Sequence, residues 1–451
     1  MSSTDAAGPL TGGRLCFRTF LTLVGVKVAC LAAVTVALFF WADMDVAKFF
    51  YVMRRWPREG GPVFASYYAT WDAAHYLYLS EVGYAKGVPA CAFYPLWPLL
   101  VRWSSHLTGG SHVAAGMILA KALSLAGLVV FAKQVRARWG WPAAKLSIVL
   151  LCVFPGALFF QFIYTEALFF LLVMLLWVGL DRRRYGLAWV SACLLPLTRA
   201  VGLFCVFPIA WHLLSHTPPA WLWGAAERWP WLRKLGGGQT SEVGGQRSGI
   251  RSRESGVGDQ ESGDRSQESG IMAPARSESG MGVSVASAGP WWLLLAPLLG
   301  WGLYLALMFS WTGNAFEGFA AQKHWGAHSV WNLVNIPKFV VGYFTPTQWH
   351  EFTGSLLDRC MFLPLLYCLP LLWRLDKSLF VWAVVLGVVP AMSGTFTSYT
   401  RFASCAFPMF IAMALYLGRP ERRHLRWGTL ILFATLHVVL LWRFVNFRWA
   451  G

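Results

Sequence analysis

The stretch "FPGALFFQFIYTEALFFLL", residues 154–172, is apolar on both sides of one short polar turn. It joins two apolar segments, residues 143–160 and 166–180, which are each close to the length that crosses a bilayer. Glu166 stands at the turn between them. Lipid offers no partner to unpaired backbone groups, so a span of this kind has to be a helix. The stretch therefore predicts a helical membrane protein.

The composition of the whole chain supports this prediction. Of its 451 residues, 57% are hydrophobic, only 13% are charged and 26 are tryptophan, which is outside the range of soluble globular proteins. The net charge of +17 does not indicate a nucleic-acid partner, because the basic residues stand in short clusters between apolar segments and there set the topology. None of the nine cysteines forms a CxxC pair, so we expect no metal site built on cysteine.

Ten apolar segments are candidate membrane spans. With one broken segment counted as two halves, they predict an all-α, polytopic bundle of about 10–11 transmembrane segments. The first segment has no cleavage pattern behind it and is expected to be a signal anchor. The candidates are residues 17–42, 113–132, 143–160, 166–180, 187–214, 291–310, 359–373, 378–392, 403–418 and 428–446.

Basic clusters between the spans predict the side on which each loop lies. Clusters such as Arg182–Arg184 mark the cytoplasmic side of the membrane. Counting outward from them places residues 43–112, 312–358 and 393–402 on the opposite side. If residues 187–214 crossed the membrane once, every later loop would lie on the side opposite to the one that the basic clusters predict.

The segment 187–214 is therefore expected to enter the membrane and return. It is interrupted at "LPLTRAVG", where Pro196, Arg199 and Gly202 break or kink a helix. We interpret it as two half-helices with Arg199 near the turn.

Residues 236–290 differ in composition from the rest of the chain. They are rich in Gly, Ser, Arg and Glu, and repeat "ESG" at positions 254, 261, 268 and 278. No apolar seam accompanies the repeat, so we expect a disordered cytoplasmic linker and not a coiled coil. It would join an amino-terminal transmembrane module, 1–235, whose large first outer loop carries a Trp-Asp motif, to a carboxy-terminal module, 291–451.

The first candidate site lies in that outer loop, in "TWDAAHYLYLSEVGYAKGVPACAFYPLWPLL", residues 70–100. If residues 72–79 are helical, Asp72 and His75 share one face. The aromatic segment 92–100 would lie at the bilayer surface, which suits a lipid-borne substrate. An interfacial helix that Asp72 merely caps explains the stretch equally well.

Three further charges stand near the membrane. Glu166, with Tyr164 beside it, lies at the outer turn, although a solvated surface carboxylate explains it too. Arg199 lies within an apolar run, where a charge costs several kcal/mol unless it is paired. Ser398 and Arg401 begin a later span on the outer side, where an arginine is also a common helix anchor.

These groups favour transfer of a group from a lipid phosphate to a hydroxyl acceptor, with arginines on the phosphate and Asp72 accepting the hydroxyl proton. The same groups also suit a lipid or oligosaccharide transporter. That alternative predicts paired broken helices in both halves of the chain, and the second half shows no partner for the break near Arg199. A noncatalytic subunit of a membrane complex is the third alternative, and it would tolerate the loss of Asp72.

Several stretches resemble the PIG-V type mannosyltransferases, a family that comprises the second mannosyltransferase of GPI-anchor synthesis and its bacterial relatives. They occur in the order of the family and cover most of the chain outside the linker. The stretches are "WDAAHYLYLSEVGY" with "AFYPLWPLL", "FPGALFFQFIYTEALFFLL", "LTRAVGL", "GNAFEGFAAQKHWG", "SYTRFASCAFPMF" and "FRWAG".

The resemblance implies a glycosyltransferase of the GT-C type. Such an enzyme takes a sugar, typically mannose, from a polyprenyl- or dolichyl-phosphate donor on the non-cytoplasmic side and passes it to a lipid-linked or glycan hydroxyl. No cofactor is implied, and a divalent ion at Asp72 and His75 is left open, since two ligands do not make a site. The composition of the linker favours a bacterial inner membrane, and a eukaryotic member would lie in the ER membrane.

The family motifs also suggest roles for single residues. Asp72 of the W-D motif would be the general base, with His75 and Glu166 positioning the acceptor or tuning that base. Arg199, from T/S-R-x-x-G, and Arg401, from S-x-x-R-[YF], would bind the donor phosphate.

Relatives often carry Gly-Asn-Pro before the A-Q-x-x-W-G motif, whereas Asn314 is followed here by Ala315.

The remaining candidates would bind substrate. The substrate-binding candidates are Trp71, Tyr164, Gln322, Trp325 and Ser398.

Overall fold

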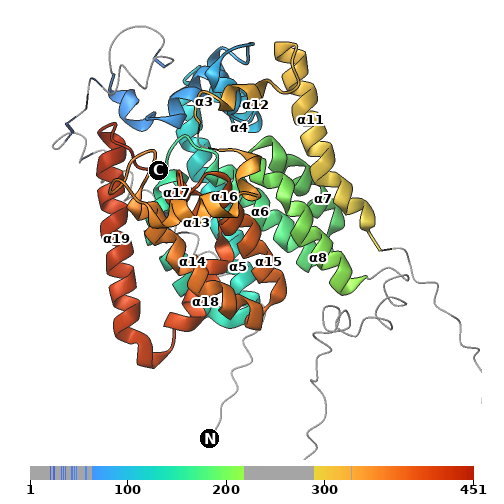
Figure 1. Cartoon of the computed structure of the whole chain (residues 1–451), viewed down its shortest axis with the longest axis vertical. Coiled ribbons are helices and arrows are strands. Elements are labelled where there is room, and N and C mark those ends of the chain that lie inside the picture. The colour runs from blue at the N-terminus through green and yellow to red at the C-terminus, as the bar shows by residue number, and fades with distance from the viewer. Residues whose placement is uncertain are drawn as a thin grey trace, which may run out of the picture. The chain divides into compact units, whose positions relative to one another are not determined.

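The computed structural model describes residues 63–217, 289–326 and 328–451, with isolated positions before residue 63. Residues 1–212 and 290–451 form one compact unit, and residues 213–289 form another. The described part of the first unit is helical and holds no β-strand (Figure 1). This confirms the predicted all-α class. The expected signal anchor at 17–42 and the expected linker at 236–290 fall almost wholly outside the described residues.

Among the described residues, four helices are long and apolar enough to cross a membrane. Shorter apolar helices accompany them, which is typical of bundles in which broken helices are buried by their neighbours. The long ones are α5 (His112–Val153), α11 (Leu295–Thr312, preceded by the turn η7, Trp291–Leu294), α14 (Leu356–Leu375) and α19 (Arg423–Val445, preceded by η10, Pro420–Arg422). The shorter ones are α6 (Glu166–Asp181), α7 (Tyr185–Leu194), α8 (Val206–His216), α15 (Lys377–Ala383), α16 (Val389–Ser393, joined to α15 by the π-turn η9, Val384–Val388) and α18 (Phe407–Leu417).

Helix α5 contains the predicted span 113–132 and the first part of the predicted span 143–160. The backbone leaves the helical region at Gly140, with φ 80° and ψ 175°, values that glycine adopts without strain. The second arm ends at Val153, and the chain continues as the 3₁₀ turn η4 (Pro155–Phe160). The predicted span 143–160 is thus α-helical over little more than half its length and forms a 3₁₀ turn over most of the rest.

The predicted break in residues 187–214 is confirmed. Between α7 and α8 lie the 3₁₀ turns η5 (Leu195–Leu197) and η6 (Ala200–Cys205), and Arg199 between them is extended. A Cβ at Gly202 would lie 2.3 Å from the carbonyl carbon of Leu195, so this close turn requires glycine. The rings of Tyr185 and His212 are 6.3 Å apart, which shows that the second half runs back along the first.

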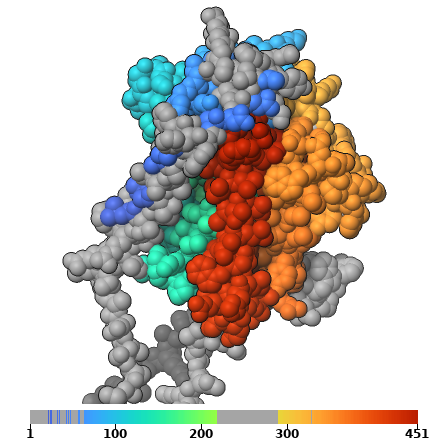
Figure 2. Space-filling view, turned by 90° about the vertical axis from the view of Figure 1, so that its left-hand side faces the viewer, coloured from blue at the N-terminus to red at the C-terminus, as the bar shows by residue number. Residues whose placement is uncertain are grey.

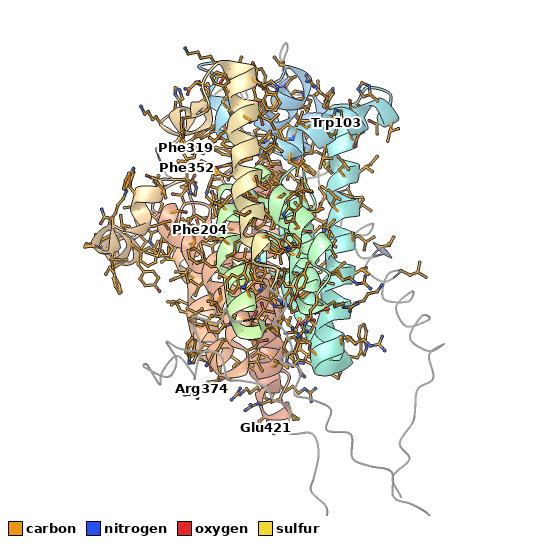
Figure 3. The ribbon with its side chains drawn as sticks, turned by 90° about the vertical axis from the view of Figure 1, so that its right-hand side faces the viewer. Trp103, Phe204, Phe319, Phe352, Arg374 and Glu421 are labelled. Atoms are coloured by element: carbon orange, nitrogen blue, oxygen red, sulfur yellow. The ribbon has the colours of Figure 1, made fainter. Side chains whose placement is uncertain are left out.

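Residues of the predicted outer loops and of the predicted cytoplasmic clusters lie at opposite ends of the bundle. Trp103 and Phe319 stand at one end, and Arg374 and Glu421 at the other (Figure 3). The first end also holds short helices, and these are α3 (Asp72–Glu81), α4 (Leu96–Ser105) and α12 (Glu317–Gln322) (Figure 1). Further short elements of the described chain are η1 (Phe64–Tyr68), η2 (Pro89–Ala92), η3 (His106–Thr108), η8 (Val330–Leu333), α13 (Ile336–Phe344) and α17 (Tyr399–Ala403).

Helix α19 runs along one face of the bundle (Figure 2). Large apolar side chains such as Trp427, Ile431 and Val438 are exposed on it, while Phe433 is buried against Phe154. A helix with exposed apolar residues on one side and packed ones on the other is suited to contact with lipid tails.

Candidate active site

Helix α3 brings Asp72 into the interior of the protein. The helix begins at Asp72, directly after Trp71, whose φ of 54° turns the chain sharply into it. The predicted helix over 72–79 is confirmed and extends to Glu81. The Asp72 carboxylate contacts Arg401, with 2.5 Å between Oδ2 and Nη1. Asp72 is therefore an ion-pair partner of Arg401, which the interpretation as a simple helix cap does not explain.

Glu166 links the two arginines that the sequence singled out. Its Oε1 lies 3.0 Å from Nη2 of Arg199 and 2.9 Å from Nε of Arg401. The structure thus orders four charges as Asp72, Arg401, Glu166 and Arg199, alternating in sign. The Glu166 side chain is completely buried, whereas that of Asp72 is 16% exposed. Of these two carboxylates, Asp72 is the one that a substrate can touch.

The elements that carry the charges explain why they meet. Glu166 begins α6, Arg199 lies in the break after η5, and Arg401 lies on α17. The ring of Phe402 receives both guanidiniums, with Arg199 at 4.3 Å and Arg401 at 4.9 Å from its centroid. Burial lowers the pKa of Arg401, but the Asp72 and Glu166 carboxylates raise it further, so the guanidinium stays charged.

A second group forms around His75 on α3 and includes Gln322 and Trp325. The His75 ring stacks on Phe93 at 5.0 Å and meets the edge of Trp325 at 5.0 Å. The side chains of Gln322 and Trp325 donate hydrogen bonds to backbone carbonyls in residues 89–92. His75 shares a helix with Asp72, but its ring contacts place it among aromatic side chains and not in the series of charges.

Three other predicted residues lie next to the charged groups. Tyr164 is buried, donates a hydrogen bond to the Thr70 carbonyl at 3.0 Å and lies under the Arg401 guanidinium. Trp71 donates to the Arg448 carbonyl at 3.3 Å. Ser398 precedes α17 with φ 58° and is nearly buried. The burial of Tyr164 and Ser398 favours positioning over direct contact with substrate.

Sequence reasoning missed His328. Its ring lies 5.5 Å from that of Phe402, and the segment is attached by a hydrogen bond from Ser329 N–H to the Ser393 carbonyl. Burial, together with the charges of Arg401 and Arg199, lowers the pKa of His328 from 6.5 to about 4. The imidazole is therefore neutral at physiological pH. The one signal in the sequence is its place two residues after Gly326, at the end of the A-Q-x-x-W-G motif.

The described residues contain no group of three or more His, Cys, Asp or Glu side chains arranged to hold a metal ion. Asp72 contacts Arg401 and His75 stacks on Phe93, so a divalent ion bound by these two residues stays a prediction.

Comparison with known proteins matches part of the chain to a family model. Residues 63–217 match the family model described as Mannosyltransferase (PIG-V). The matched stretch contains Asp72, His75, Tyr164, Glu166 and Arg199, and the match confirms over these residues the resemblance predicted from the sequence. A search of curated proteins finds no match.

Among solved structures, the chain is similar to an oligosaccharyltransferase of Archaeoglobus fulgidus. The structure of AglB in complex with an inhibitory peptide and a dolichol-phosphate has 12% sequence identity and a TM-score of 0.38, with 96% of this chain and 56% of that chain covered. A structure tethered with an acceptor peptide has 11% identity and a TM-score of 0.39, with 96% and 55% covered. The chain spans about half the length of these proteins.

Proposed function

We propose, from the match of residues 63–217 to the PIG-V mannosyltransferases and from the buried charges, that the chain is a membrane glycosyltransferase. It transfers a sugar, mannose in the first instance, from a polyprenyl- or dolichyl-phosphate donor to a hydroxyl of a lipid-linked or glycan acceptor on the non-cytoplasmic face. The observation that carries the proposal is the series Asp72, Arg401, Glu166, Arg199.

The two arginines are suited to the donor phosphate. Each guanidinium matches phosphate geometry, and Glu166 between them holds both at a fixed separation. Negative charge develops on the phosphate oxygen as its bond to the sugar breaks, and cations held in a buried site stabilise that charge more than water does. Arg199 and Arg401 would thus lower the barrier to departure of the lipid phosphate.

Asp72 is suited to be the base because it is the partly exposed carboxylate of the series. The acceptor hydroxyl gives its proton to Asp72, its oxygen attacks the sugar carbon, and the electron pair of the broken bond stays on the phosphate. Attack from the opposite face inverts the sugar carbon.

The aromatic group would hold the sugar or the lipid. Trp325, Phe93 and His75 offer ring faces and edges close to α3, and residues 92–100 would lie at the bilayer surface. Neutral His328 offers a hydrogen bond without adding a third positive charge beside the arginines.

The test is sugar transfer in proteoliposomes, with labelled polyprenyl-phosphate mannose and a lipid extract as acceptor. Asp72→Asn should lower transfer at least about 100-fold, roughly 3 kcal/mol of the barrier, as expected on loss of a general base. Glu81→Gln is the matched control, because Glu81 ends the same helix and accepts a hydrogen bond from Trp56. Gel filtration and thermal unfolding check that both variants fold.

Equal transfer by the wild type and Asp72→Asn would remove Asp72 from the mechanism. If the wild type transfers nothing from several donors, the function is wrong, and movement of the labelled lipid between leaflets of the same vesicles would favour the transporter.

A further inference from the structure

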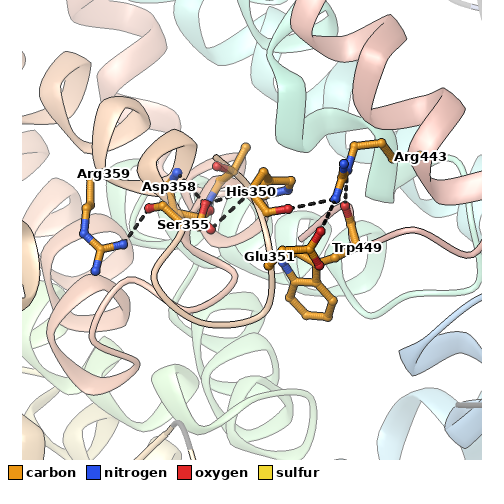
Figure 4. Close-up of polar contacts among 8 residues, drawn as sticks. His350, Glu351, Ser355, Asp358, Arg359, Arg443 and Trp449 are labelled. Carbon is orange, nitrogen blue, oxygen red and sulfur yellow. Dashed lines mark hydrogen bonds and ion pairs between the residues drawn. The ribbon is translucent and has the colours of Figure 1, made fainter. Parts of the chain in front are cut away.

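A second polar cluster lies at the start of α14, outside the site described above (Figure 4). Asp358, in the first turn of α14, is completely buried. Ser355 caps the helix, since its Oγ accepts the Asp358 N–H at 3.1 Å. His350 approaches both side chains, with its Nδ1 2.9 Å from Ser355 Oγ and 3.7 Å from Asp358 Oδ2.

The cluster is attached to α19 and to the segment after that helix. Arg443 of α19 donates to the carbonyls of His350 and Trp449 at 2.8 and 2.6 Å, and pairs with Glu351 at 2.8 Å (Figure 4). Trp449 in turn meets the edge of Trp71, the residue before Asp72, at 5.0 Å. The "FRWAG" motif at 447–451 therefore packs against the residue that precedes Asp72.

Asp358 also reaches the short helix that carries Arg401. Its Oδ1 accepts the Thr400 N–H at 2.6 Å. The first N–H groups of a helix need acceptors, which usually come from the residue before it. That residue is Ser398, and within the described part of the chain its side chain makes no capping bond to α17. Asp358 supplies the missing acceptor from a neighbouring helix.

The opposite side of α17 is packed just as closely. Gly156 of η4 lies against the Thr400 backbone, where a Cβ would approach the Thr400 carbonyl oxygen to 1.9 Å. Helix α17 is thus held between the Asp358 carboxylate and the backbone of η4. Arg401 is the next residue of α17, and its contacts with Asp72 and Glu166 depend on where this helix lies.

We propose that Asp358 is a positioning residue for Arg401, which it places for the donor phosphate by fixing the Thr400 N–H. The inference rests on the proposed role of Arg401 in binding the donor. A carboxylate forms a shorter and stronger hydrogen bond than a neutral acceptor does, which suits a group that has to hold a five-residue helix in place. The charged or titratable groups around it are His350, Arg359 and Tyr399, and Arg359 itself donates to the Ser355 carbonyl.

The test compares Asp358→Ala with Asp358→Asn, whose amide oxygen still accepts the Thr400 N–H. The alanine variant should lower kcat/KM for the donor about 10- to 100-fold, since a misplacement near 1 Å costs that much. The asparagine variant should recover most of it. Asp376→Ala is the control, because the Asp376 carboxylate also accepts a backbone N–H at the start of a helix, that of Ser378 in α15, but lies at the other end of α14. It should leave the donor KM unchanged.

A double-mutant cycle separates positioning from general stability. In an Arg401→Lys background, Asp358→Ala should change kcat/KM by less than about twofold, because the guanidinium that Asp358 positions is already absent. A loss as large as in the wild-type background would overturn the proposal. If the alanine variant does not fold, Asp358→Ser replaces it, since a serine oxygen stands too far from Thr400 to accept its N–H.

Hydrogen exchange tests the inference without any activity. Amides of residues 399–403 should exchange faster in Asp358→Ala than in the wild type and remain slow in Asp358→Asn. Unchanged exchange in the alanine variant would overturn the proposal whatever the activity shows. Faster exchange in a protein whose wild type is inactive with all donors would leave the contact standing and refute the proposed function instead.

Discussion

Replacement of Glu166 by glutamine removes one buried charge with almost no change of shape. Glu166 Oε1 contacts Arg199 at 3.0 Å and Arg401 at 2.9 Å, and the side chain is completely buried. Charge centres about 4 Å apart attract by about 4 kcal/mol at an effective dielectric constant near 20. Desolvation offsets much of that gain, and breaking one buried pair costs about 3–5 kcal/mol. Asp72 still compensates Arg401, so we expect Glu166→Gln to lower the free energy of unfolding by about 3–4 kcal/mol.

Reversible SDS titration in mixed micelles, followed by tryptophan fluorescence, measures this free energy. The matched control is Glu317→Gln, because Glu317 is also buried but accepts hydrogen bonds from two neutral donors, Gly87 N–H at 2.7 Å and Asn314 Nδ2 at 3.1 Å. Its amide keeps one acceptor oxygen, so we expect a loss of about 1–2 kcal/mol.

Equal losses in the two variants would show that Glu166 does not act as the counter-ion of the arginines. A second experiment measures the double variant with Glu166→Gln and Arg199→Gln. Removal of one uncompensated cation should restore part of the stability, and a further loss equal to that of Arg199→Gln alone would show that the pair is not coupled.

Two more predictions concern the surroundings of Arg401. Gly156→Ala should displace α17 and lower both transfer and unfolding free energy, the latter by about 1–3 kcal/mol, whereas Gly186→Ala on α7, with nothing within 4 Å, should be neutral or slightly stabilising in the same SDS titration. His328 has a folded pKa of about 4, below its unfolded value of 6.5, so its contribution to stability is complete above pH 6.5 and is lost as the pH falls toward 4. His328→Gln should therefore reduce the fall in unfolding free energy between pH 7 and pH 5, and an unchanged fall would contradict the assignment.

Much of the fold could be predicted from local signals. Hydropathy located α6, α11, α14, α18 and α19 to within a few residues, because a chain segment in a bilayer has to be helical and its side chains apolar. The break near Arg199 was predictable because proline lacks an N–H donor and glycine permits a close turn. The second arm of α5 was predicted too long, because Pro155 ends it early and a 3₁₀ turn replaces the rest.

Site residues were predictable one at a time and not as pairs. A charge in an apolar run has a high cost, so Arg199 stood out in the sequence. Glu166 stood out by its place at the outer turn between two spans. Nothing local indicates that Glu166 bridges Arg199 and Arg401, or that Asp72 pairs with a residue 329 positions away. His328 and Asp358 were missed for the same reason, since each lies in an ordinary outer loop or helix start.

The helical class, the broken segment and the charged residues that need partners can all be predicted from the amino-acid sequence, since each depends on hydropathy, backbone chemistry or the cost of burying a charge. Which charges meet, which carboxylate is open to substrate and which neighbours hold Arg401 in place became known only from the tertiary structure. These contacts join α3, α6, α14 and α17, which lie far apart along the chain, and their geometry depends on how helices pack, which no local pattern encodes.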